Sequence, residues 1–306
     1  MCGRYAASSR PEDLVEEWEI DVDRTDDPAR SMLAAPQSPP PGSPDYNVAP
    51  TKQAPVVLTR PIRGEQRNEG GEGDEGAKGD EGDEGDEGAG RHPRAEARPP
   101  QRQLRLLTWG LLPSWAKDTK TGLRMTNARA ESVLDKPAFA KPAASRRALV
   151  PADGWYEWQV SPTALDAKGN PRKQPFFVTR ADGATMAMAA LYEFWRDPTA
   201  EPTDPLAWLT TYAIITTTAE PGQDRIHDRQ PLVLERQDWG RWLDPAMTEL
   251  DEIRGLLAYA EPGRFDARPV STAVNATRNN GPELIRPLGR ADLVGVVDPS
   301  TGEVLG

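Results

Sequence analysis

Cys2 follows Met1 directly and is the only cysteine in the 306-residue sequence. Once Met1 is removed, Cys2 carries a free α-amine and a thiol on the same residue. An aldehyde can condense with this amine to an imine, and the thiol can then close onto the imine carbon to give a five-membered thiazolidine. The ordinary pKa is about 7.7 to 8.0 for an α-amine and about 8.5 for a thiol, so neither group needs a large shift to react. A protein that captures carbonyl groups would begin this way, but the position of Cys2 alone proves little, because most cysteines beside a start codon are simply small residues.

Capture of an aldehyde requires proton transfer, and a histidine near neutral pH is the usual carrier. The chain has two histidines. His92 flanks an acidic segment and is expected to be inert. His227 lies in the polar turn of residues 225–231, so it is the candidate for proton transfer, with a solvated loop histidine as the alternative.

Glu157 is the second candidate, in the aromatic run of residues 153–158. If this run is a strand, alternation places Glu157 on the face of Trp155, with Tyr156 and Trp158 on the opposite face. Burial among aromatic side chains raises the pKa of a carboxyl group and suits a general acid or base. The alternative is a carboxylate at a strand edge that points to water.

Three further segments combine polar and aromatic residues. Residues 126–132 offer the amide of Asn127 at the start of an expected helix, where an N-cap is the default role and contact with a sugar hydroxyl or an imine is the other. Residues 109–115 join two tryptophans through a bend, which suits either the core or a stacking wedge for bases. Residues 47–51 form a short loop that could shape the mouth of a pocket.

The net charge of −11 is concentrated in one segment. Residues 69–87 contain ten acidic residues and one lysine, a net charge of −9, so the rest of the chain is near neutral. Glycine and like charge cannot build a core, and we expect this segment to be a disordered, solvated insertion. The other interpretation is a tethered acidic strand that competes with phosphates for a basic groove.

The cysteine and hydropathy patterns limit the class of protein. A single cysteine excludes an internal disulfide framework and a multi-cysteine metal site, and it suits a reducing cytosol. Residues 1–30 contain no apolar run of signal-peptide type, and no stretch approaches the length of a membrane span. We therefore expect a soluble cytoplasmic protein.

Hydrophobic patterning predicts many strands with a few interspersed helices. A first short helix is expected after the capping-box spacing of residues 9–12, followed by a loop over residues 26–44. Because strands and helices do not alternate regularly, we expect one α+β domain around a mostly antiparallel sheet or barrel, with the acidic insertion joining two neighbouring strands. The expected strands are 54–59, 104–108, 148–151, 155–160, 175–179, 185–191, 209–217 and 231–234, and the other expected helices are 130–134, 237–243 and 249–259.

Seven motifs in order resemble the SRAP family of SOS-response-associated peptidases, or abasic-site processing proteins. They are the opening CGR, NVAPT, WGLLPSW, NARAES, PADGWYEW, IHDRQP, and a late VS followed by NNGPELI. The resemblance implies the SRAP fold, a single α+β domain with a mostly antiparallel, barrel-like β core and peripheral helices. That domain would span residues 1–288, interrupted by the insertion at 64–100 and followed by a tail at 289–306.

The resemblance also implies a function. Met1 would be removed, and Cys2 would capture the ring-opened aldehyde of an abasic site in single-stranded DNA by lyase-like Schiff-base chemistry. The product would be a thiazolidine DNA–protein crosslink that shields the lesion in the DNA damage response. Neither a metal nor another cofactor would be needed. The partners would be DNA and possible replication or repair machinery, with no membrane, and the protein would be a monomer that associates with the nucleoid when bound to DNA.

Site residues follow from the same motifs. Cys2 would be nucleophile and amine donor, Asn127 would position the sugar or amine, Glu157 would be general acid or base, and His227 would assist ring opening and imine formation. The residues expected at the DNA are Arg4, Arg129 and Arg229 on phosphates, Trp109, Pro113, Asn47 and Pro50 near the base stack, and Thr216 on the sugar-phosphate.

Two other functional classes remain open on the sequence. A processed Cys2 with Glu157 and His227 could serve an N-terminal-nucleophile cysteine peptidase or amidohydrolase that acts on a peptide or on itself. A non-catalytic binder of single strands would need neither Glu157 nor His227.

Overall fold

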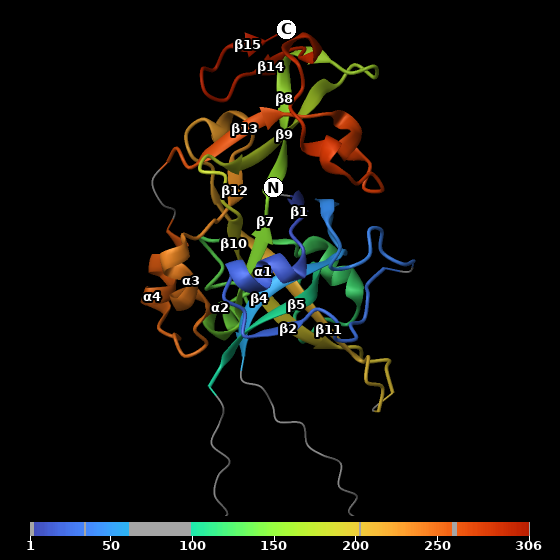
Figure 1. Ribbon diagram of the computed structural model, residues 1–306, viewed down its shortest axis with the longest axis vertical. Coiled ribbons are helices and arrows are strands. Elements are labelled where there is room, and N and C mark those ends of the chain that lie inside the picture. The colour runs from blue at the N-terminus through green and yellow to red at the C-terminus, as the bar shows by residue number, and fades with distance from the viewer. Residues whose placement is uncertain (1–2, 34, 61–98, 202, 259–261, 306) are drawn as a thin grey trace, which may run out of the picture.

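The computed structural model describes residues 3–33, 35–60, 99–201, 203–258 and 262–305. Cys2, His92 and the acidic segment of residues 69–87 lie outside the described residues. Among those described, strands form two main sheets, and short helices lie around them (Figure 1).

Five strands close into a barrel. Neighbours in the order β11-β10-β7-β4-β5 pair antiparallel, and a parallel pairing of β5 with β11 closes the ring. The expected α+β architecture with a barrel-like β core is confirmed. The strands are β4 (Gln53–Arg60), β5 (Gln101–Trp109), β7 (Arg147–Ala152), β10 (Met186–Arg196) and β11 (Trp208–Thr218).

The pairing of β4 with β5 confirms a prediction about the insertion. The two strands run antiparallel from Gln53 opposite Thr108 to Arg60 opposite Gln101. Residues 61–98 therefore connect two neighbouring strands of one sheet. Alternating side chains supply the cores on both faces, because Val56 and Leu58 belong to one buried cluster and Val57 to another.

A second sheet of five strands in the order β13-β9-β8-β1-β3 lies above the barrel in Figure 1. Its strands are β1 (Arg4–Ala7), β3 (Asp45–Val48), β8 (Gly154–Leu165), β9 (Pro171–Arg180) and β13 (Phe265–Pro269). The remaining strands are short: β2 (Val22–Arg24), β6 (Asn127–Arg129), β12 (Arg229–Pro231), β14 (Val296–Val297) and β15 (Val304–Leu305).

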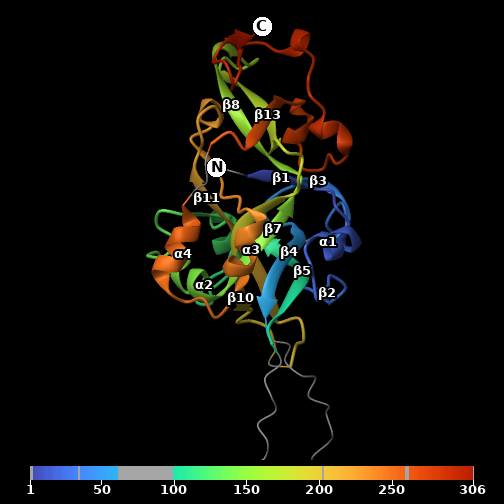
Figure 2. The same ribbon diagram turned by 60° about the vertical axis from the view of Figure 1, so that its left-hand side comes forward.

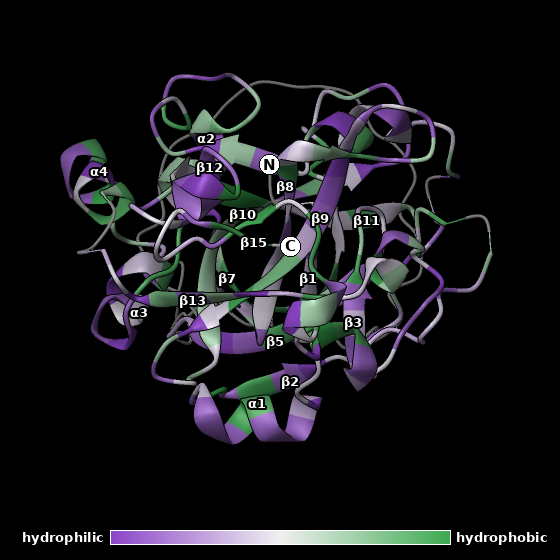
Figure 3. Cartoon of the chain, turned by 90° about the horizontal axis from the view of Figure 1, so that it is seen from above, coloured by the Kyte–Doolittle hydropathy of each residue, from purple (hydrophilic) through white to green (hydrophobic). Residues whose placement is uncertain are grey.

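In the described part of the chain, four α-helices lie at the periphery of the barrel (Figures 2 and 3). They are α1 (Pro11–Glu17), α2 (Ala140–Ser145), α3 (Arg236–Leu243) and α4 (Leu250–Leu257). The stacked rings of Trp18 and Trp239, 4.1 Å apart, join the end of α1 to α3 within the cluster that covers the outer face of the barrel. The expected first helix is confirmed, but its capping box is not, because Arg10 is the N-cap and makes no side-chain cap bond.

Buried Arg147 fixes two of these helices on the barrel. Its guanidinium donates to carbonyl groups at the C-terminal ends of α2 and α3, where the last carbonyls of a helix have no intrahelical donor. A cation at these ends also favours the helix dipoles. The acceptors are the carbonyls of Ala143, Ala144, Trp242, Asp244 and Met247.

Two sequence expectations need correction. Residues 130–134 form turns rather than a helix. The residues just before them, Asn127–Arg129, pair with β11 as strand β6, so their backbone is extended and cannot form the first turn of a helix. The expected strand at 231–234 begins earlier, as β12, and continues only through a single bridge between Met188 and Val233. The predicted helix at 237–243 is confirmed as α3, and the one predicted at 249–259 is confirmed as α4 over Leu250–Leu257, with residue 259 outside the described residues.

The last described residues fold back on the second sheet. Gln159 in β8 donates to the carbonyl of Val297, and Ser161 donates to that of Gly295. The segment treated above as a tail thus packs along β8. None of the helices in the described part of the chain is long and apolar enough to cross a membrane.

Gly110 allows the chain to leave β5, and its replacement should destabilise the fold. Its φ is +127°, and a Cβ there would lie 2.7 Å from the Gly122 carbonyl oxygen. We expect Gly110→Ala to lower the free energy of unfolding by about 2 to 4 kcal/mol. Urea unfolding measures the change.

Gly240→Ala is the matched control. Gly240 lies inside α3, and an added Cβ meets nothing within 4 Å. The better helix propensity of alanine should leave the free energy of unfolding equal or raise it by up to about 1 kcal/mol. Equal losses for both variants would contradict the role assigned to Gly110.

Candidate active site

Strand β6 positions Asn127. It pairs parallel with β11, with Asn127 opposite Ile214 and Arg129 opposite Thr216. The indole of Trp109 donates to the carbonyl of Thr126 over 2.8 Å, which fixes the backbone one residue before Asn127. Asn127 is therefore a strand residue held by the barrel and not the N-cap of a helix.

Glu157 lies on β8 with 4% of its surface exposed. The predicted alternation is confirmed, because Trp155 belongs to one buried cluster while Tyr156 and Trp158 belong to another. Burial raises the pKa of Glu157 to about 7, with the charge of Asp228 a lesser contribution in the same direction. Near neutral pH its carboxyl group can therefore both donate and accept a proton.

His227 follows the short helix η2 (Gln223–Arg225) and is partly buried. Its Nδ1 accepts the backbone N–H of Arg229 at 3.0 Å and also lies 2.9 Å from Oδ1 of Asp228. The first contact fits an unprotonated Nδ1 and the second a protonated one, so the two neighbours support both tautomers of the ring. Burial lowers the pKa of His227, which favours the neutral imidazole.

The loop that carries His227 packs against the face of β8 that carries Glu157. Gln159 lies two residues after Glu157, on the same face of the strand, and its amide donates to the carbonyl of Arg225 over 3.1 Å. Asp228 is close enough to influence the pKa of Glu157. The structure thus brings a carboxyl group and an imidazole together from segments 70 residues apart.

Arg4 is held by the protein. Its Nη1 donates to Oδ1 of Asn47 and to the carbonyl of Val274, both over 2.8 Å, and its Nη2 donates to the carbonyl of Asn275. These bonds anchor β1 to β3 and to the loop near residue 275. In this arrangement Arg4 orients the strand that leads from Cys2.

Asn47 is fully buried, and its side chain is engaged within the protein. Its amide donates to backbone carbonyls in the loop of residues 274–279, and Lys52, itself paired with Asp45 at 2.7 Å, donates to its carbonyl. Pro50 next to it is only partly buried. Asn47 thus lies in strand β3 rather than in a loop, and its side chain supports Arg4.

Trp109 and Pro113, which were expected near the base stack, are also buried. Trp109 lies in the barrel with Tyr5 and Tyr212, whose hydroxyl groups are hydrogen-bonded at 2.6 Å. Trp115, the second tryptophan of the same motif, is 61% exposed. The exposed aromatic surface of the motif is thus at Trp115.

Arg229 is paired with the carboxylate of Glu131. Both terminal nitrogens contact Glu131, at 2.7 and 2.9 Å, and Nη2 also donates to the carbonyl of Thr216 over 2.6 Å. Glu131 lies in the NARAES motif, but no sequence pattern pairs it with a residue 98 positions away. The arginine is therefore oriented before any ligand arrives.

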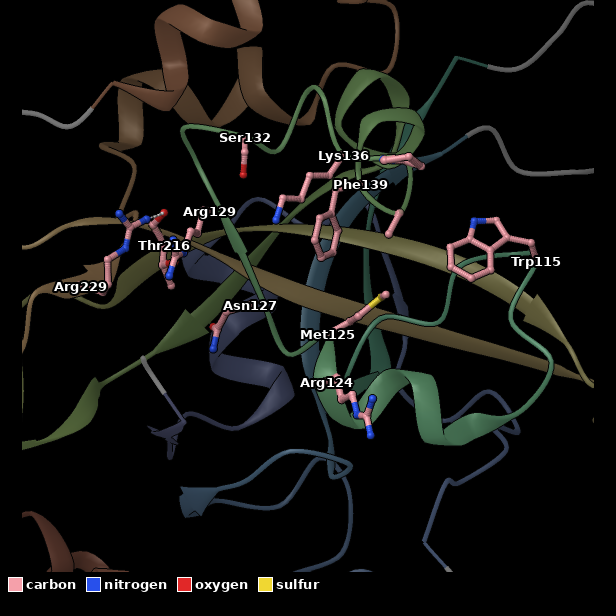
Figure 4. A pocket seen from close by; sticks show the side chains of 12 residues that line it. Trp115, Arg124, Met125, Asn127, Arg129, Ser132, Lys136, Phe139, Thr216 and Arg229 are labelled. Atoms are coloured by element: carbon pink, nitrogen blue, oxygen red, sulfur yellow. Dashed lines mark hydrogen bonds between the residues drawn. The ribbon is translucent and has the colours of Figure 1, made fainter.

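A cavity of about 480 Å³ lies beside β6 (Figure 4). Its lining combines predicted site residues with others that were not selected. Figure 4 shows Asn127, Arg129, Thr216 and Arg229 at one end, Trp115 at the other, and Met125, Lys136 and Phe139 between them. Glu157 and His227 do not line this cavity, although Arg229 does and follows His227 by two residues. Among the described residues, no group of three or more His, Cys, Asp or Glu side chains could hold a metal ion.

A sequence model of the SOS response associated peptidase (SRAP) family matches residues 1–277. The chain belongs to this family. The motifs that suggested it run through β1, the Asn47 loop, β5, β6, β8 and β12, the elements that build the site. The resemblance stated from the sequence is confirmed.

Two relatives and one solved structure show what the chain is similar to. The abasic site processing protein YoqW of Bacillus subtilis (strain 168) is 33% identical over 287 residues, covering 93% of this chain and 99% of the relative. The abasic site processing protein HMCES of Rattus norvegicus is 27% identical and covers 98% of this chain and 78% of its own length. A solved protein from Bacteroides thetaiotaomicron shares the fold, with a TM-score of 0.61 at 18% identity over 94% of this chain and all of that one.

The raised pKa of Glu157 should appear in the pH dependence of stability. The folded protein retains this proton between about pH 4.5 and 7, whereas the unfolded chain releases it, so this contribution to stability falls as pH rises through that window. Between pH 5 and 8 the wild type should lose up to about 3 kcal/mol relative to Glu157→Gln, which cannot titrate. Urea unfolding at both pH values measures it, and parallel losses in the two proteins would contradict the assignment.

Proposed function

We propose that this protein processes abasic sites in single-stranded DNA by forming a covalent thiazolidine crosslink through Cys2 after removal of Met1. The crosslink would shield the lesion from strand cleavage. The names of YoqW and HMCES support the substrate class. The geometry around β1 and β8 supports the chemistry.

The register of β1 against β8 is the observation that carries the proposal. Arg4 lies opposite Tyr156 and Tyr5 opposite Trp155 in antiparallel register. Continuing this register by one residue places Gly3 opposite Glu157. The start of β1, directly after Cys2, therefore lies beside Glu157. The carboxyl group of Glu157 titrates near neutral pH and lies on the face of β8 against which the His227 loop packs.

Ring opening comes first in the proposed mechanism, because an abasic deoxyribose is mostly a closed hemiacetal. One group removes the proton of the anomeric hydroxyl while another protonates the ring oxygen, which breaks the C1′–O4′ bond and forms the aldehyde. Glu157 in its acid form supplies the proton, and His227, in the tautomer with Nδ1–H toward Asp228, accepts one at Nε2.

Condensation follows. The α-amine of Cys2 adds to the aldehyde carbon, and protonation of the resulting hydroxyl expels one water and leaves the imine. The thiol then adds to the imine carbon while its proton passes to the nitrogen, so aldehyde and aminothiol give thiazolidine and water. Asn127 is assigned to hold the sugar or the amine, since its strand is fixed by β11 and its amide lines the cavity.

Arginines orient the DNA backbone in this proposal. Arg129 and Arg229 line the same cavity as Asn127. Arg129 can contact a phosphate beside the lesion, and Arg229 can do so once the phosphate displaces Glu131. Arg4 is assigned instead to positioning the N-terminal strand, on the bonds it makes with Asn47 and Val274.

Variants at the N-terminus test the crosslink. Cys2→Ala should abolish the crosslinked band with an abasic single strand on a denaturing gel. Cys2→Ser should give at most a weaker product, because oxygen closes an oxazolidine-type ring. A form that keeps residues ahead of Cys2 should also be inactive with every side chain intact, whereas the same residues added at the C-terminus are the control.

The peptidase in the family description is the competing function. Turnover of a peptide by the purified protein, together with an undiminished crosslink in Cys2→Ala, would overturn the proposal. Loss of the crosslink in Glu157→Gln with retained DNA binding would separate a chemical role from simple single-strand binding.

Glu131 should limit the affinity for DNA. It occupies both terminal nitrogens of Arg229, so Glu131→Gln should free them for a phosphate and tighten equilibrium binding of single-stranded DNA by about 3- to 10-fold at low salt. Glu252→Gln, an exposed position on α4, is the control for the same change in net charge. Equal effects of the two substitutions would show that only overall charge matters.

A further inference from the structure

Residues 293–300, the C-terminal segment below, lie beyond the part of the chain that the family model matches, yet they contact the loop that carries His227. We infer that the C-terminal segment, through Arg225, holds His227 in place for proton transfer. The His227 loop here means residues 219–228. This inference rests on the proposed function, in which His227 and Glu157 share the opening of the sugar.

Gln159 ties the His227 loop and the C-terminal segment to the strand of Glu157. Its amide donates to the carbonyl of Arg225 over 3.1 Å and to that of Val297 over 2.9 Å, and its Oε1 accepts the backbone N–H of Val297 over 2.8 Å. Only 2% of Gln159 is exposed, so water cannot readily replace these bonds. One buried side chain on β8 therefore fixes the backbone of both segments, two residues after Glu157.

The guanidinium of Arg225 joins the two segments a second time. Its Nη1 donates to the carbonyls of Pro299 and Ser300. The backbones also approach closely at Gly222, where an added Cβ would lie 3.2 Å from the carbonyl oxygen of Pro299. Arg225 is an exposed residue, so its side chain can be replaced without leaving a cavity in the core.

Apolar packing holds the residue directly before His227. Ile226 is 7% exposed and shares a buried cluster with Phe176 of β9 and with Leu293 and Val296 of the C-terminal segment. The backbone that enters His227 is thus fixed by hydrogen bonds at residue 225 and by packing at residue 226. Two groups that transfer protons on one sugar need such fixed spacing, since a misplacement of about 1 Å can lower a rate about 100-fold.

Crosslinking of two single strands tests the inference. One carries a natural abasic deoxyribose, which must be opened. The other carries an acyclic linker with an aldehyde and no hydroxyl group that could close a ring. At saturating DNA, Arg225→Ala should slow crosslinking of the first strand by about 3- to 10-fold and leave the second unchanged. A lost contact with DNA would instead raise the concentration for half-maximal rate on both strands.

Three further variants assign the effect. Arg225→Lys keeps a cationic donor for the Pro299 carbonyl and should recover most of the rate. Arg172→Ala is the matched control, because Arg172 lies on β9 and donates to the carbonyl of Val294 in the C-terminal segment over 3.5 Å, so the same charge is lost outside the His227 loop. Both of its rates should equal those of the wild type. In a His227→Ala background, Arg225→Ala should have no further effect, because a residue that acts through the imidazole loses its influence when the imidazole is absent.

Amide hydrogen exchange follows the same contact without any crosslinking. Within the loop, the N–H of His227 donates to the carbonyl of Gln223 over 3.1 Å, and that of Ala219 donates to the carbonyl of Asp228 over 3.0 Å. If Arg225 holds the loop, Arg225→Ala should speed exchange in residues 219–228 by about 3- to 10-fold, whereas Arg172→Ala should not.

The outcomes separate the two proposals. Unchanged exchange in Arg225→Ala, equal slowing on both strands, or an undiminished effect in the His227→Ala background overturns the positioning of His227, and a crosslink that depends on Cys2 leaves the proposed function standing. Failure of the wild type to crosslink either strand, with faster loop exchange in Arg225→Ala, overturns the capture chemistry but supports the positioning of His227 by the C-terminal segment.

Discussion

Strand β11 is the element on which both the barrel and the site depend, because it has two partners along each edge. Its first half lies between β10 and β5 and closes the barrel, with Thr211 opposite Thr108 and Tyr212 opposite Trp109. Its second half lies between β6 and β12, with Thr216 opposite both Arg129 and Pro231. The hydrogen bonds that complete the fold therefore continue directly into those that hold Asn127, Arg129 and Arg229.

Buried residues act on the site through this strand. Trp109 touches no solvent, yet its indole fixes the carbonyl next to Asn127, and Tyr212 is hydrogen-bonded to Tyr5 in β1. The strand that leads from Cys2 and the strand that carries Asn127 are thus tied to neighbouring residues of β11 and β5. A reaction that joins an N-terminal amine to a sugar held elsewhere requires such a common frame, because misplacement of reacting groups by about 1 Å is costly.

Long amphipathic strands could be predicted from the sequence because their alternation is a local property. Alternation predicts the face of Glu157 and the pairing of the strands on either side of the insertion. Helices α3 and α4 follow from the helical spacing of apolar residues, which is also local. Strands β1, β3 and β6 have four residues or fewer, and they form through pairing with strands that come from distant parts of the sequence. At residues 130–134 helix propensity loses to the pairing of β6, and tertiary contacts routinely override so weak a preference.

Polar site residues were harder to place than apolar ones. In the sequence Asn47 resembles a loop residue that could contact a ligand. In the fold its amide donates to backbone carbonyls near residue 275, and its own carbonyl accepts a hydrogen bond from Lys52. The pairing of Glu131 with Arg229 spans 98 positions and has no local signal. Composition, charge and alternation describe what each segment can bury, whereas the partner of a charged group depends on which segments meet.

The negative net charge limits how strongly the protein can attract DNA. Its net charge is −11, so long-range attraction to a polyanion is absent, and contacts with phosphates must come from a few local cations. One cation of the cavity, Arg229, is already paired with Glu131. Weak reversible binding is sufficient if the bond that follows is covalent, because the lifetime of the complex then depends on the thiazolidine rather than on the phosphates.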